Sequence, residues 1–339
     1  MKKAFLALTL LLSVFVLAAC GGGAGYADQT LNVYFVPSRP ADEILEVTEP
    51  LSDLLKNELA ELGFEVGGVE ILVSSTYEAA GEALIAGTGD IAFLPGGTYV
   101  AYKDLDGSPI EVLLAATRAG LSKDAADAAA WNDGEATTGD PEYQVAYYKG
   151  LIIAGPSEAG QAVSATVNSG AELAWEDVKD LNWCVRSATS SSGYIYPAVW
   201  LLDNFGKTFD DIEGSVTTTG GYGDTASSLA TGTCDVGTFY ADARRDYADE
   251  WEGDYGRSAS IWAETNVVGV TSNIMNDTIS VSTLNMDQDL IDAIKQAFLN
   301  IAETQAGQDV MSVYSHQGYT EVSDSDYDAA RTAAEIAGE

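Results

Sequence analysis

The chain has 339 residues, a formal net charge of −36, three cysteines and one histidine. So acidic a protein is a poor partner for nucleic acid or anionic lipid, because both carry negative charge. The single histidine nearly excludes a histidine-assisted nucleophile, and a zinc site would need His316 together with the distant Cys184 and Cys234. We therefore expect no metal and no cofactor, and we attribute the acidity to a salty medium or to solubility.

The first residues predict export. Met1-Lys-Lys precedes an apolar run that is too short to favour a permanent membrane span, and Leu17-Ala-Ala-Cys20 follows. Residues 1–19 are expected to be a lipoprotein signal peptide, Cys20 the lipidated residue, and 20–29 a flexible tether. The alternative is an ordinary secretory signal with a chance cysteine. In either case the mature protein lies outside the cytoplasm, and any membrane contact is made through the lipid alone.

Strands and helices alternate through the next hundred residues. Leu31–Val36 is predicted to be a buried strand that ends in the turn-like Pro37-Ser-Arg-Pro40. The pattern continues with a helix at 51–62, a strand at 69–73, a helix at 77–86 and a strand at 90–94. This alternation favours an α/β fold with a parallel or mixed sheet.

The second half of the chain indicates another lobe and a return to the first. Residues 119–143 lose the pattern and are expected to be an exposed loop, and a strand at 144–154 is expected to cross between lobes. The later predictions are a strand at 182–187 leading into a helix, a helix and strand within 217–240, strands at 267–270 and 278–281, and a helix at 288–304. We expect lobe 1 to comprise 30–146 and 267–339, and lobe 2 to comprise 147–266.

One polar stretch stands out, from Ser187 to Trp200. Three consecutive hydroxyls, Ser190, Ser191 and Ser192, precede Gly193 and a helical pattern with Pro197 in its first turn. A helix start offers unpaired N–H groups and a partial positive charge, so the stretch could bind a tetrahedral oxyanion without a formal positive charge. The alternative is a serine-rich N-cap with no ligand.

Two helical segments resemble each other. Residues 77–91 and 222–236 share Tyr, Leu, Gly, Thr and Asp in the same register, 145 residues apart. Each reads as a helix that begins with a tyrosine, stops at a glycine and leads into a strand. The match is short enough to be coincidence. If it is not, two similarly built lobes aim Tyr77 and Tyr222 at one cleft, outside the carboxyl ends of the strands.

Cysteine usage predicts a disulfide. With Cys20 assigned to the lipid, Cys184 and Cys234 remain in an oxidising compartment, each in a strand-like segment of the same predicted lobe. We expect them to be bonded to each other.

With these segments placed, the sequence resembles the phosphate/phosphite/phosphonate-binding proteins of ABC importers, which are two-lobed class II periplasmic-type binding proteins. The resemblance runs from Val33 to about Ala334. It is carried by Ser74-Ser-Thr-Tyr77, Gly87-Thr-Gly-Asp-Ile-Ala92, Thr189-Ser-Ser-Ser-Gly-Tyr194, Asp235-Val-Gly-Thr-Phe-Tyr-Ala-Asp-Ala-Arg244 and Ile274-Met-Asn-Asp277. It implies mixed sheets flanked by helices, with a ligand cleft between the lobes.

The resemblance also implies ligand-binding residues. The family's hydroxyl motif falls on Ser190, Ser191 and Ser192 with the backbone of Gly193, and Ser191 stands where the family has Thr. Tyr222 stands where the family often has His, so the pH response of the site is in question. The remaining matches are Tyr77, Tyr147 with Tyr148 as the alternative, Asp242 and Asp277. Tyr77 and loop residues near Thr98 are expected to close on the ligand from the first lobe. The two aspartates could receive an amino group or a protonated oxygen of the ligand, or be a structural cap and a turn residue.

The resemblance predicts a monomeric, lipid-anchored binding protein that closes on phosphonate, phosphite or a related oxyanion. It would pass the ligand to an ABC permease and ATPase. The same cleft would also serve a sensor or chemoreceptor, which the sequence does not separate from import. A serine hydrolase is disfavoured, because no Gly-x-Ser-x-Gly elbow surrounds the serine cluster and His316 is expected in the other lobe.

Overall fold

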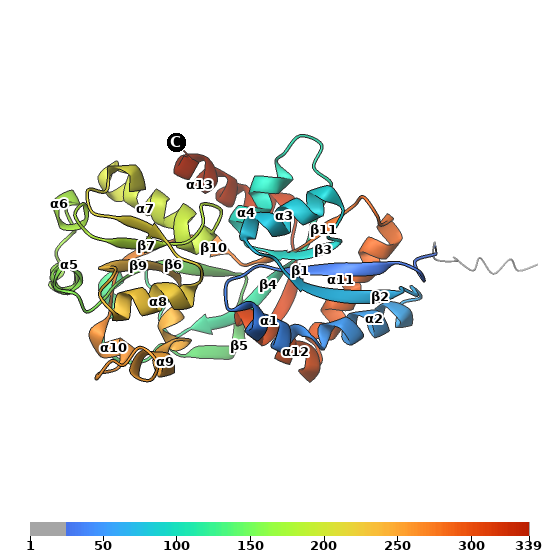
Figure 1. Cartoon of the computed structure of the whole chain (residues 1–339), viewed down its shortest axis with the longest axis horizontal. Coiled ribbons are helices and arrows are strands. Elements are labelled where there is room, and N and C mark those ends of the chain that lie inside the picture. The colour runs from blue at the N-terminus through green and yellow to red at the C-terminus, as the bar shows by residue number, and fades with distance from the viewer. Residues whose placement is uncertain (1–24, 339) are drawn as a thin grey trace, which may run out of the picture.

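The computed structural model describes residues 25–338, so the predicted signal peptide and Cys20 lie outside the described residues. Two lobes lie next to each other along the long axis of the molecule, each a β-sheet with helices packed on it (Figure 1). Lobe 1 contains a seven-stranded sheet and lobe 2 a five-stranded sheet. Within residues 25–338, no helix combines the length and apolar character that crossing a bilayer requires. The predicted two-lobed α/β class is confirmed.

The sheet of lobe 1 is mixed. Its strand order is β12-β4-β11-β3-β1-β2, and β5 pairs with β4. β1 runs parallel to β2 and β3, whereas β11 is antiparallel to β3 and β4. The strands are β1 (Thr30–Phe35), β2 (Gly68–Val73), β3 (Ile91–Leu94), β4 (Ile110–Leu121), β5 (Gly139–Val145), β11 (Thr278–Ser282) and β12 (Gly318–Glu321).

The helices of lobe 1 follow local signals in the sequence. Thr76 caps α3 by accepting a hydrogen bond from the Ala79 amide, and Gly87 ends the helix at a φ of 68°, which favours glycine. The sequence pattern missed α1, which starts after Pro40. The helices are α1 (Ala41–Thr48), α2 (Leu51–Glu61), α3 (Tyr77–Ala86), α4 (Gly96–Lys103), α11 (Gln288–Ala302), α12 (Gln305–Met311) and α13 (Asp328–Gly338).

Lobe 2 has the strand order β10-β6-β9-β7-β8. Cys184 on β7 and Cys234 just before β9 form a disulfide, with Cα atoms 5.8 Å apart. The strands are β6 (Tyr147–Ala154), β7 (Trp183–Val185), β8 (Val216–Thr218), β9 (Val236–Tyr240) and β10 (Asn266–Met275). The helices are α5 (Glu158–Asn168), α6 (Trp175–Val178), α7 (Tyr196–Phe205), α8 (Tyr222–Ala230), α9 (Ala248–Glu252) and α10 (Ile261–Glu264).

The chain returns to lobe 1 later than the sequence predicts. β10 pairs with β6 as far as Met275 and therefore belongs to lobe 2, whereas β11 begins lobe 1 again at Thr278. The boundary placed at 267 was wrong, because a strand pattern alone does not identify the partner strand. The C-terminal α13 is also shared, since it packs against α4 of lobe 1 and α7 of lobe 2.

The segment 119–143 is more ordered than the predicted exposed loop. It holds the end of β4, a short 3₁₀ helix at Ala128–Trp131 and the start of β5. Trp131 is fully buried in the core of lobe 2, and its indole N–H donates to the carbonyl of Ala125. The expectation failed because one buried tryptophan holds an otherwise polar stretch in place.

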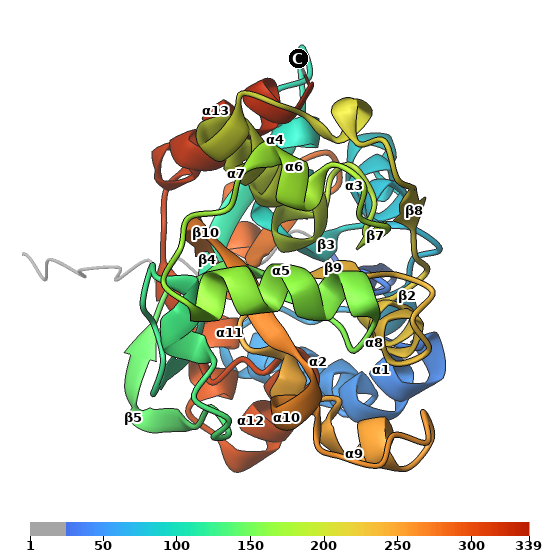
Figure 2. The same ribbon diagram turned by 90° about the vertical axis from the view of Figure 1, so that its left-hand side faces the viewer.

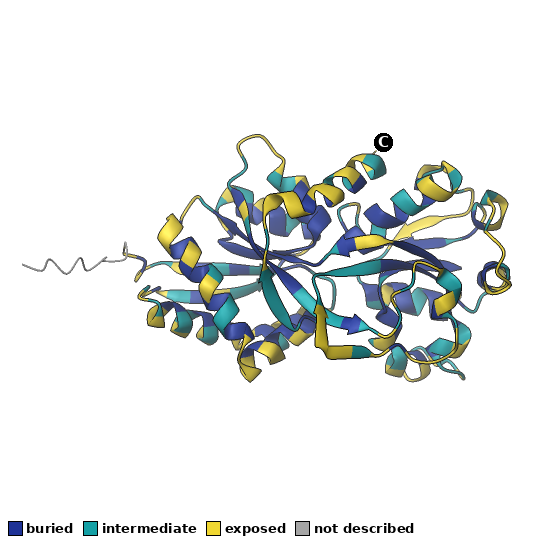
Figure 3. Ribbon diagram, turned by 180° about the vertical axis from the view of Figure 1, so that it is seen from behind, coloured by how far each residue is buried: buried dark blue, intermediate teal, exposed yellow. Residues whose placement is uncertain are grey.

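The apolar cores lie where the helices cover the sheets. Figure 2 looks onto lobe 2, with α5 lying across the sheet in front, and Figure 3 shows buried strands between helices whose outer faces are exposed. Lobe 1 has one large core, and lobe 2 has one on each face of its sheet. A smaller cluster of Ile195, Tyr196, Ile274 and Ala333 joins the lobes. This packing fixes the strand ends that face each other across the lobes.

Candidate functional site

Four helices begin where the lobes meet. α3 follows β2, α4 follows β3, the helix that includes α7 follows β7, and α8 follows β8. The residues at these four starts line a common cavity, which we call the inner cavity. Because each helix start carries unpaired N–H groups and a partial positive charge, their convergence favours a bound anion.

The predicted serine cluster forms one of these starts. After β7 the chain turns into a wide helical turn, Ser191–Ile195, which continues as α7 with Pro197 in its first turn. Ser190, Ser191 and Ser192 are 1–3% exposed and all line the inner cavity. The stretch therefore brings three hydroxyls and the first N–H groups of a helix to one buried place.

The two predicted tyrosines lie at the starts of α3 and α8 and also line the cavity. Tyr222 Oη forms hydrogen bonds with Ser192 Oγ (2.9 Å) and Ser190 Oγ (3.3 Å). Arg186 contacts both rings, with its guanidinium carbon 5.7 Å from the centre of Tyr77 and 5.4 Å from that of Tyr222. Burial raises the pKa of Tyr77 far above its ordinary value, so its hydroxyl keeps its proton as a donor.

The inner cavity also contains formal positive charge, which the serine cluster by itself does not predict. Arg118 on β4 stacks on the ring of Tyr148, with its guanidinium carbon 4.5 Å from the centre of that ring and 5.9 Å from the ring centre of Tyr240. Its buried Nε has no hydrogen-bond partner among the described residues. Arg39, which follows β1, also lines the cavity and pairs with Asp246 across the lobes at 3.0 Å. β1 and β4 therefore supply cations from lobe 1, which the sequence analysis did not name as site residues.

Asp277 is the acidic residue of the inner cavity. Its Oδ2 lies 3.6 Å from Nε2 of His316 and 4.0 Å from Nη2 of Arg118. Burial opposes ionisation of Asp277, but His316 and Arg118 outweigh it and lower its pKa. Burial lowers the pKa of His316, with Arg118 adding to the effect and Asp277 opposing it. An ionised Asp277 can only accept hydrogen bonds, so it favours a ligand that carries a proton at this position.

The inner cavity has a volume of about 40 Å³. It is rich in hydroxyl groups, with five serines and five tyrosines among its lining residues. The lining consists of Val36, Ser38, Arg39, Tyr77, Pro95, Arg118, Tyr148, Ser190, Ser191, Ser192, Tyr222, Tyr240, Asp277, Tyr314 and Ser315. Both lobes contribute, so the site is complete only where they meet.

Hydrogen bonds join the lobes directly beside the cavity. The Gly97 amide at the start of α4 donates to Ser191 Oγ at 2.9 Å. Thr98 Oγ1 lies 3.4 Å from both the carbonyl and the hydroxyl oxygen of Thr189, and Thr189 Oγ1 donates to Glu78 at 2.8 Å. Thr98 therefore lies in the contact between the lobes and does not line the inner cavity.

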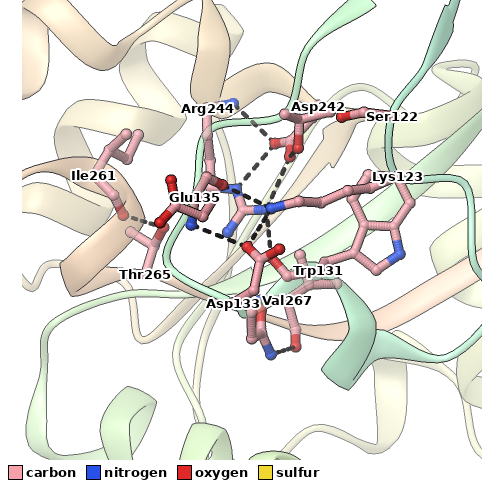
Figure 4. A network of polar contacts seen from close by, with 12 residues as sticks. Ser122, Lys123, Trp131, Asp133, Glu135, Asp242, Arg244, Ile261, Thr265 and Val267 are labelled. Atoms are coloured by element: carbon pink, nitrogen blue, oxygen red, sulfur yellow. Dashed lines mark hydrogen bonds and ion pairs between the residues drawn. The ribbon is translucent and has the colours of Figure 1, made fainter.

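Asp242 is placed away from the inner cavity, in a buried ion pair (Figure 4). Arg244 donates to it from Nε at 3.0 Å and from Nη2 at 2.8 Å, and Thr137 Oγ1 donates at 2.7 Å. These partners occupy the carboxylate, and Asp242 lines a neighbouring hollow with Tyr147 and Tyr148 instead of the inner cavity.

Two more predicted residues, Tyr147 and Gly193, do not line the inner cavity. Tyr147 donates to Asp124 at 3.1 Å and is absent from the cavity lining, whereas its neighbour Tyr148 is part of it. Successive side chains of a strand point to opposite faces, so only one of the pair reaches the cavity. Gly193 anchors the helix start to β9, because its carbonyl accepts a hydrogen bond from Thr238 Oγ1 at 2.6 Å. A side chain would not fit here, since an added Cβ would lie 2.4 Å from Arg186.

Sequence reasoning missed several lining residues, notably Arg39, Arg118, Tyr240 and Tyr314. One signal was present for Arg39 and its neighbour Ser38, because they lie in the turn directly after the carboxyl end of β1, where α/β sheets bind ligands. Arg118 lies within a long strand and has no local signal. Among residues 25–338 there is no cluster of His, Cys, Asp and Glu suited to a metal ion.

A family model for the periplasmic phosphonate substrate-binding protein of ABC transporters matches residues 33–327. The chain belongs to this family. Its members are solute-binding proteins outside the cytoplasm, which fits a cavity completed by two lobes. No curated protein sequence matches this chain significantly.

Solved structures share the fold at low sequence identity. A binding protein of an ABC phosphonate transporter from Pseudomonas aeruginosa has a TM-score of 0.62 at 15% identity, covering 90% of this chain and 85% of that one. PhnD1 from Prochlorococcus marinus in complex with methylphosphonate has a TM-score of 0.60 at 14% identity, and the match covers 90% of this chain and 97% of that one. XAC2383 from Xanthomonas citri bound to ATP has a TM-score of 0.63 at 14% identity, and the match covers 91% of this chain and 97% of that one. These similarities establish a periplasmic binding protein fold.

Proposed function

We propose that this protein captures a phosphonate, phosphite or related phosphorus oxyanion outside the cytoplasm and delivers it to an ABC importer. The lobes would close around the ligand about the strands that cross between them. The observation that carries this proposal is the inner cavity, which is lined by the hydroxyls of Ser190 to Ser192 and by Arg118, whose buried Nε has no hydrogen-bond partner among the described residues.

The chemistry of the cavity favours an anion over a neutral solute. The buried Nε of Arg118 has no hydrogen-bond partner among the described residues, and a buried polar group costs free energy until it is hydrogen-bonded. Hydrogen bonds to a charged group contribute roughly 1.5–3 kcal/mol each, more than neutral ones. A phosphorus oxyanion accepts several such bonds at once, from hydroxyls, helix N–H groups and the guanidinium.

Binding without catalysis is part of the proposal. His316, the one histidine of the chain, lies beside Asp277 and packs edge-on against Tyr314, and within residues 25–338 it forms no hydrogen bond with a serine side chain. A serine nucleophile would need such a base within hydrogen-bond reach. We therefore expect the protein not to turn over phosphoesters or phosphonates.

We also propose that Cys20 is lipidated and holds a monomeric protein at the outer face of the cytoplasmic membrane. The support is the Leu17-Ala-Ala-Cys20 sequence. In addition, β1 starts at the end of lobe 1 that lies away from lobe 2, so an anchor there would leave the cleft accessible to ligand and permease (Figure 1). Mass spectrometry of membrane-extracted protein tests this point, and an unmodified Cys20 or its absence from the mature chain would contradict it.

Isothermal calorimetry with phosphite, phosphate, methylphosphonate, 2-aminoethylphosphonate and sulfate tests the ligand class. We expect at least one phosphorus oxyanion to bind, and Ser191→Ala to weaken that binding by about tenfold or more, since it removes a donor and the acceptor of the Gly97 bond. Ser169→Ala, at the exposed end of α5, is the matched control. No binding of any phosphorus oxyanion to ligand-free protein, or an unchanged affinity in Ser191→Ala, would contradict the proposal.

A further inference from the structure

The inner cavity is too small to enclose a large ligand. Its volume of about 40 Å³ has room for roughly three water molecules, at roughly 10–15 Å³ each. Pockets that enclose whole organic ligands usually measure about 300–1,000 Å³. The inner cavity therefore fits an oxyanion group and little more, so a substituent much larger than a methyl group must extend beyond it.

A second hollow adjoins the inner cavity and has a volume of about 560 Å³. We call it the outer groove. It lies beside the strands that cross between the lobes, and β4, β5, β6 and α12 contribute to its lining. Arg118, Tyr148, Tyr240 and Ser315 line both hollows, so these four residues form the border between them. A substituent leaving the inner cavity past this border would enter the outer groove.

Three residues that line the outer groove each have a buried polar atom without a hydrogen-bond partner among the described residues. They are Arg118 Nε, His316 Nε2 and Gln317 Oε1, and all three residues line the groove. The arginine N–H is a donor and the amide oxygen an acceptor, while a neutral imidazole nitrogen can be either. A hydroxyl group both donates and accepts, so it satisfies such a mixed set better than an ammonium or a carboxylate.

The charges of the outer groove largely cancel. Three of its aspartates are paired. Asp124 lies 3.7 Å from Lys149, which also lines the groove, whereas Asp242 and Asp246 pair at 2.8 Å and 3.0 Å with Arg244 and Arg39 outside it. Arg245 and Asp309 remain as one residue of each sign, and Arg118 lies at the border with the inner cavity. A groove of this composition favours a neutral, polar substituent.

We propose that the ligand has two parts, with its oxyanion in the inner cavity and a neutral, hydroxyl-bearing organic substituent in the outer groove. This inference rests on the proposed function and narrows its ligand to hydroxylated phosphonates or phosphate monoesters. Gln317 acts as a specificity-determining residue for the substituent, and the three serines serve the oxyanion common to all ligands.

Calorimetry on the mature protein tests the inference with methylphosphonate, 2-hydroxyethylphosphonate and glycerol 3-phosphate. We expect at least one of the two hydroxylated ligands to bind about tenfold or more tightly than methylphosphonate. Gln317→Leu is expected to abolish this advantage while leaving methylphosphonate binding within twofold of wild type. Gln296→Leu, on the exposed face of α11, is the control for the same change outside the groove.

The outcomes separate the two proposals. If methylphosphonate binds at least as tightly as both hydroxylated ligands, the two-part ligand is refuted while the oxyanion-binding function stands. The same follows if Gln317→Leu leaves the advantage intact. If none of the three ligands binds, and neither phosphite nor phosphate binds, the proposed function itself fails. The comparison between ligands on wild-type protein does not depend on the folding of any variant.

Discussion

Gly97 allows the two lobes to meet, and Gly97→Ala is expected to impair ligand binding without impairing folding. A Cβ at this position would lie 2.4 Å from Ile195 Cδ1, 2.7 Å from the carbonyl oxygen of Thr189 and 3.2 Å from Ser191 Oγ. All three atoms belong to lobe 2. The substitution therefore strains the contact between the lobes and leaves the interior of lobe 1 unchanged.

The size of the effect follows from these distances. Moving the Cβ from 2.7 Å to an ordinary 3.4 Å contact with the Thr189 oxygen requires the lobes to part by about 0.7 Å (3.4 − 2.7). Overpacking costs roughly 1–3 kcal/mol, and weakening the bond from Gly97 N–H to Ser191 Oγ costs about 1 kcal/mol. A total of about 2–4 kcal/mol corresponds to a loss of affinity of roughly 30-fold to several hundredfold.

Calorimetry with the tightest-binding oxyanion measures the affinity, and small-angle scattering with and without ligand measures compaction. Gly96→Ala is the matched control, because its Cβ would meet Tyr327 at 3.2 Å and Ala330 at 3.8 Å, and none of its three nearest atoms comes from the Thr189–Ile195 segment of lobe 2. We expect Gly97→Ala to lose affinity and ligand-induced compaction while its thermal midpoint without ligand stays near that of the control. Wild-type affinity and compaction in Gly97→Ala would refute the reasoning.

Three further predictions follow from the site. Tyr148→Phe should weaken oxyanion binding by roughly fivefold or more, and Tyr147→Phe should weaken it by less than twofold, because only Tyr148 lines the inner cavity. Equal losses of affinity in calorimetry would contradict this prediction. Asp242→Ala should lower the free energy of unfolding by about 3–5 kcal/mol, since it leaves the buried Arg244 unpaired, and chemical denaturation measures this loss. The same variant should bind amino-bearing ligands no more weakly, relative to other ligands, than the wild type does, which calorimetry measures. The pKa of His316 is lowered in the folded state, so the unfolded chain takes up a proton first and folding stability falls as the pH drops through about 6.5. His316→Gln should not show this fall, and parallel thermal midpoints of the two proteins from pH 7.5 to 5.5 would contradict the assignment.

The local part of the site could be predicted from the sequence, because caps and helix starts are encoded within a few residues. Thr76 before Tyr77, and the serines before Pro197, mark helix starts that the structure confirms. The repeated pattern likewise predicts that Tyr77 and Tyr222 occupy equivalent places. Both are the first residue of a helix, and both line the inner cavity.

The cations of the site could not be predicted in the same way. Arg118 and Ser191 are 73 residues apart and reach one cavity only because β4 and the start of α7 belong to different lobes that meet. Nothing in the neighbourhood of Arg118 distinguishes it from a surface arginine. Its role depends on long-range packing, which periodicity and capping signals do not describe.

Two other differences arise from choices that sequence patterns leave open. Tyr147 and Tyr148 are neighbours on β6, and only the register of the strand decides which of them reaches the cavity. Asp242 has its partner two residues away, and the bidentate pairing with Arg244 fixes the aspartate in the interior of lobe 2. The Asp-Ala-Arg spacing was visible in the sequence and could have indicated this pair.

A crystal structure of the mature protein with methylphosphonate would test the central claim most directly. The account predicts the phosphorus atom in the inner cavity, with its oxygens within hydrogen-bonding distance of the Ser190–Ser192 hydroxyls and the Arg118 guanidinium, and with Gly97 still bonded to Ser191. A ligand bound outside this cavity, or held without contact to the serine cluster, would contradict the account.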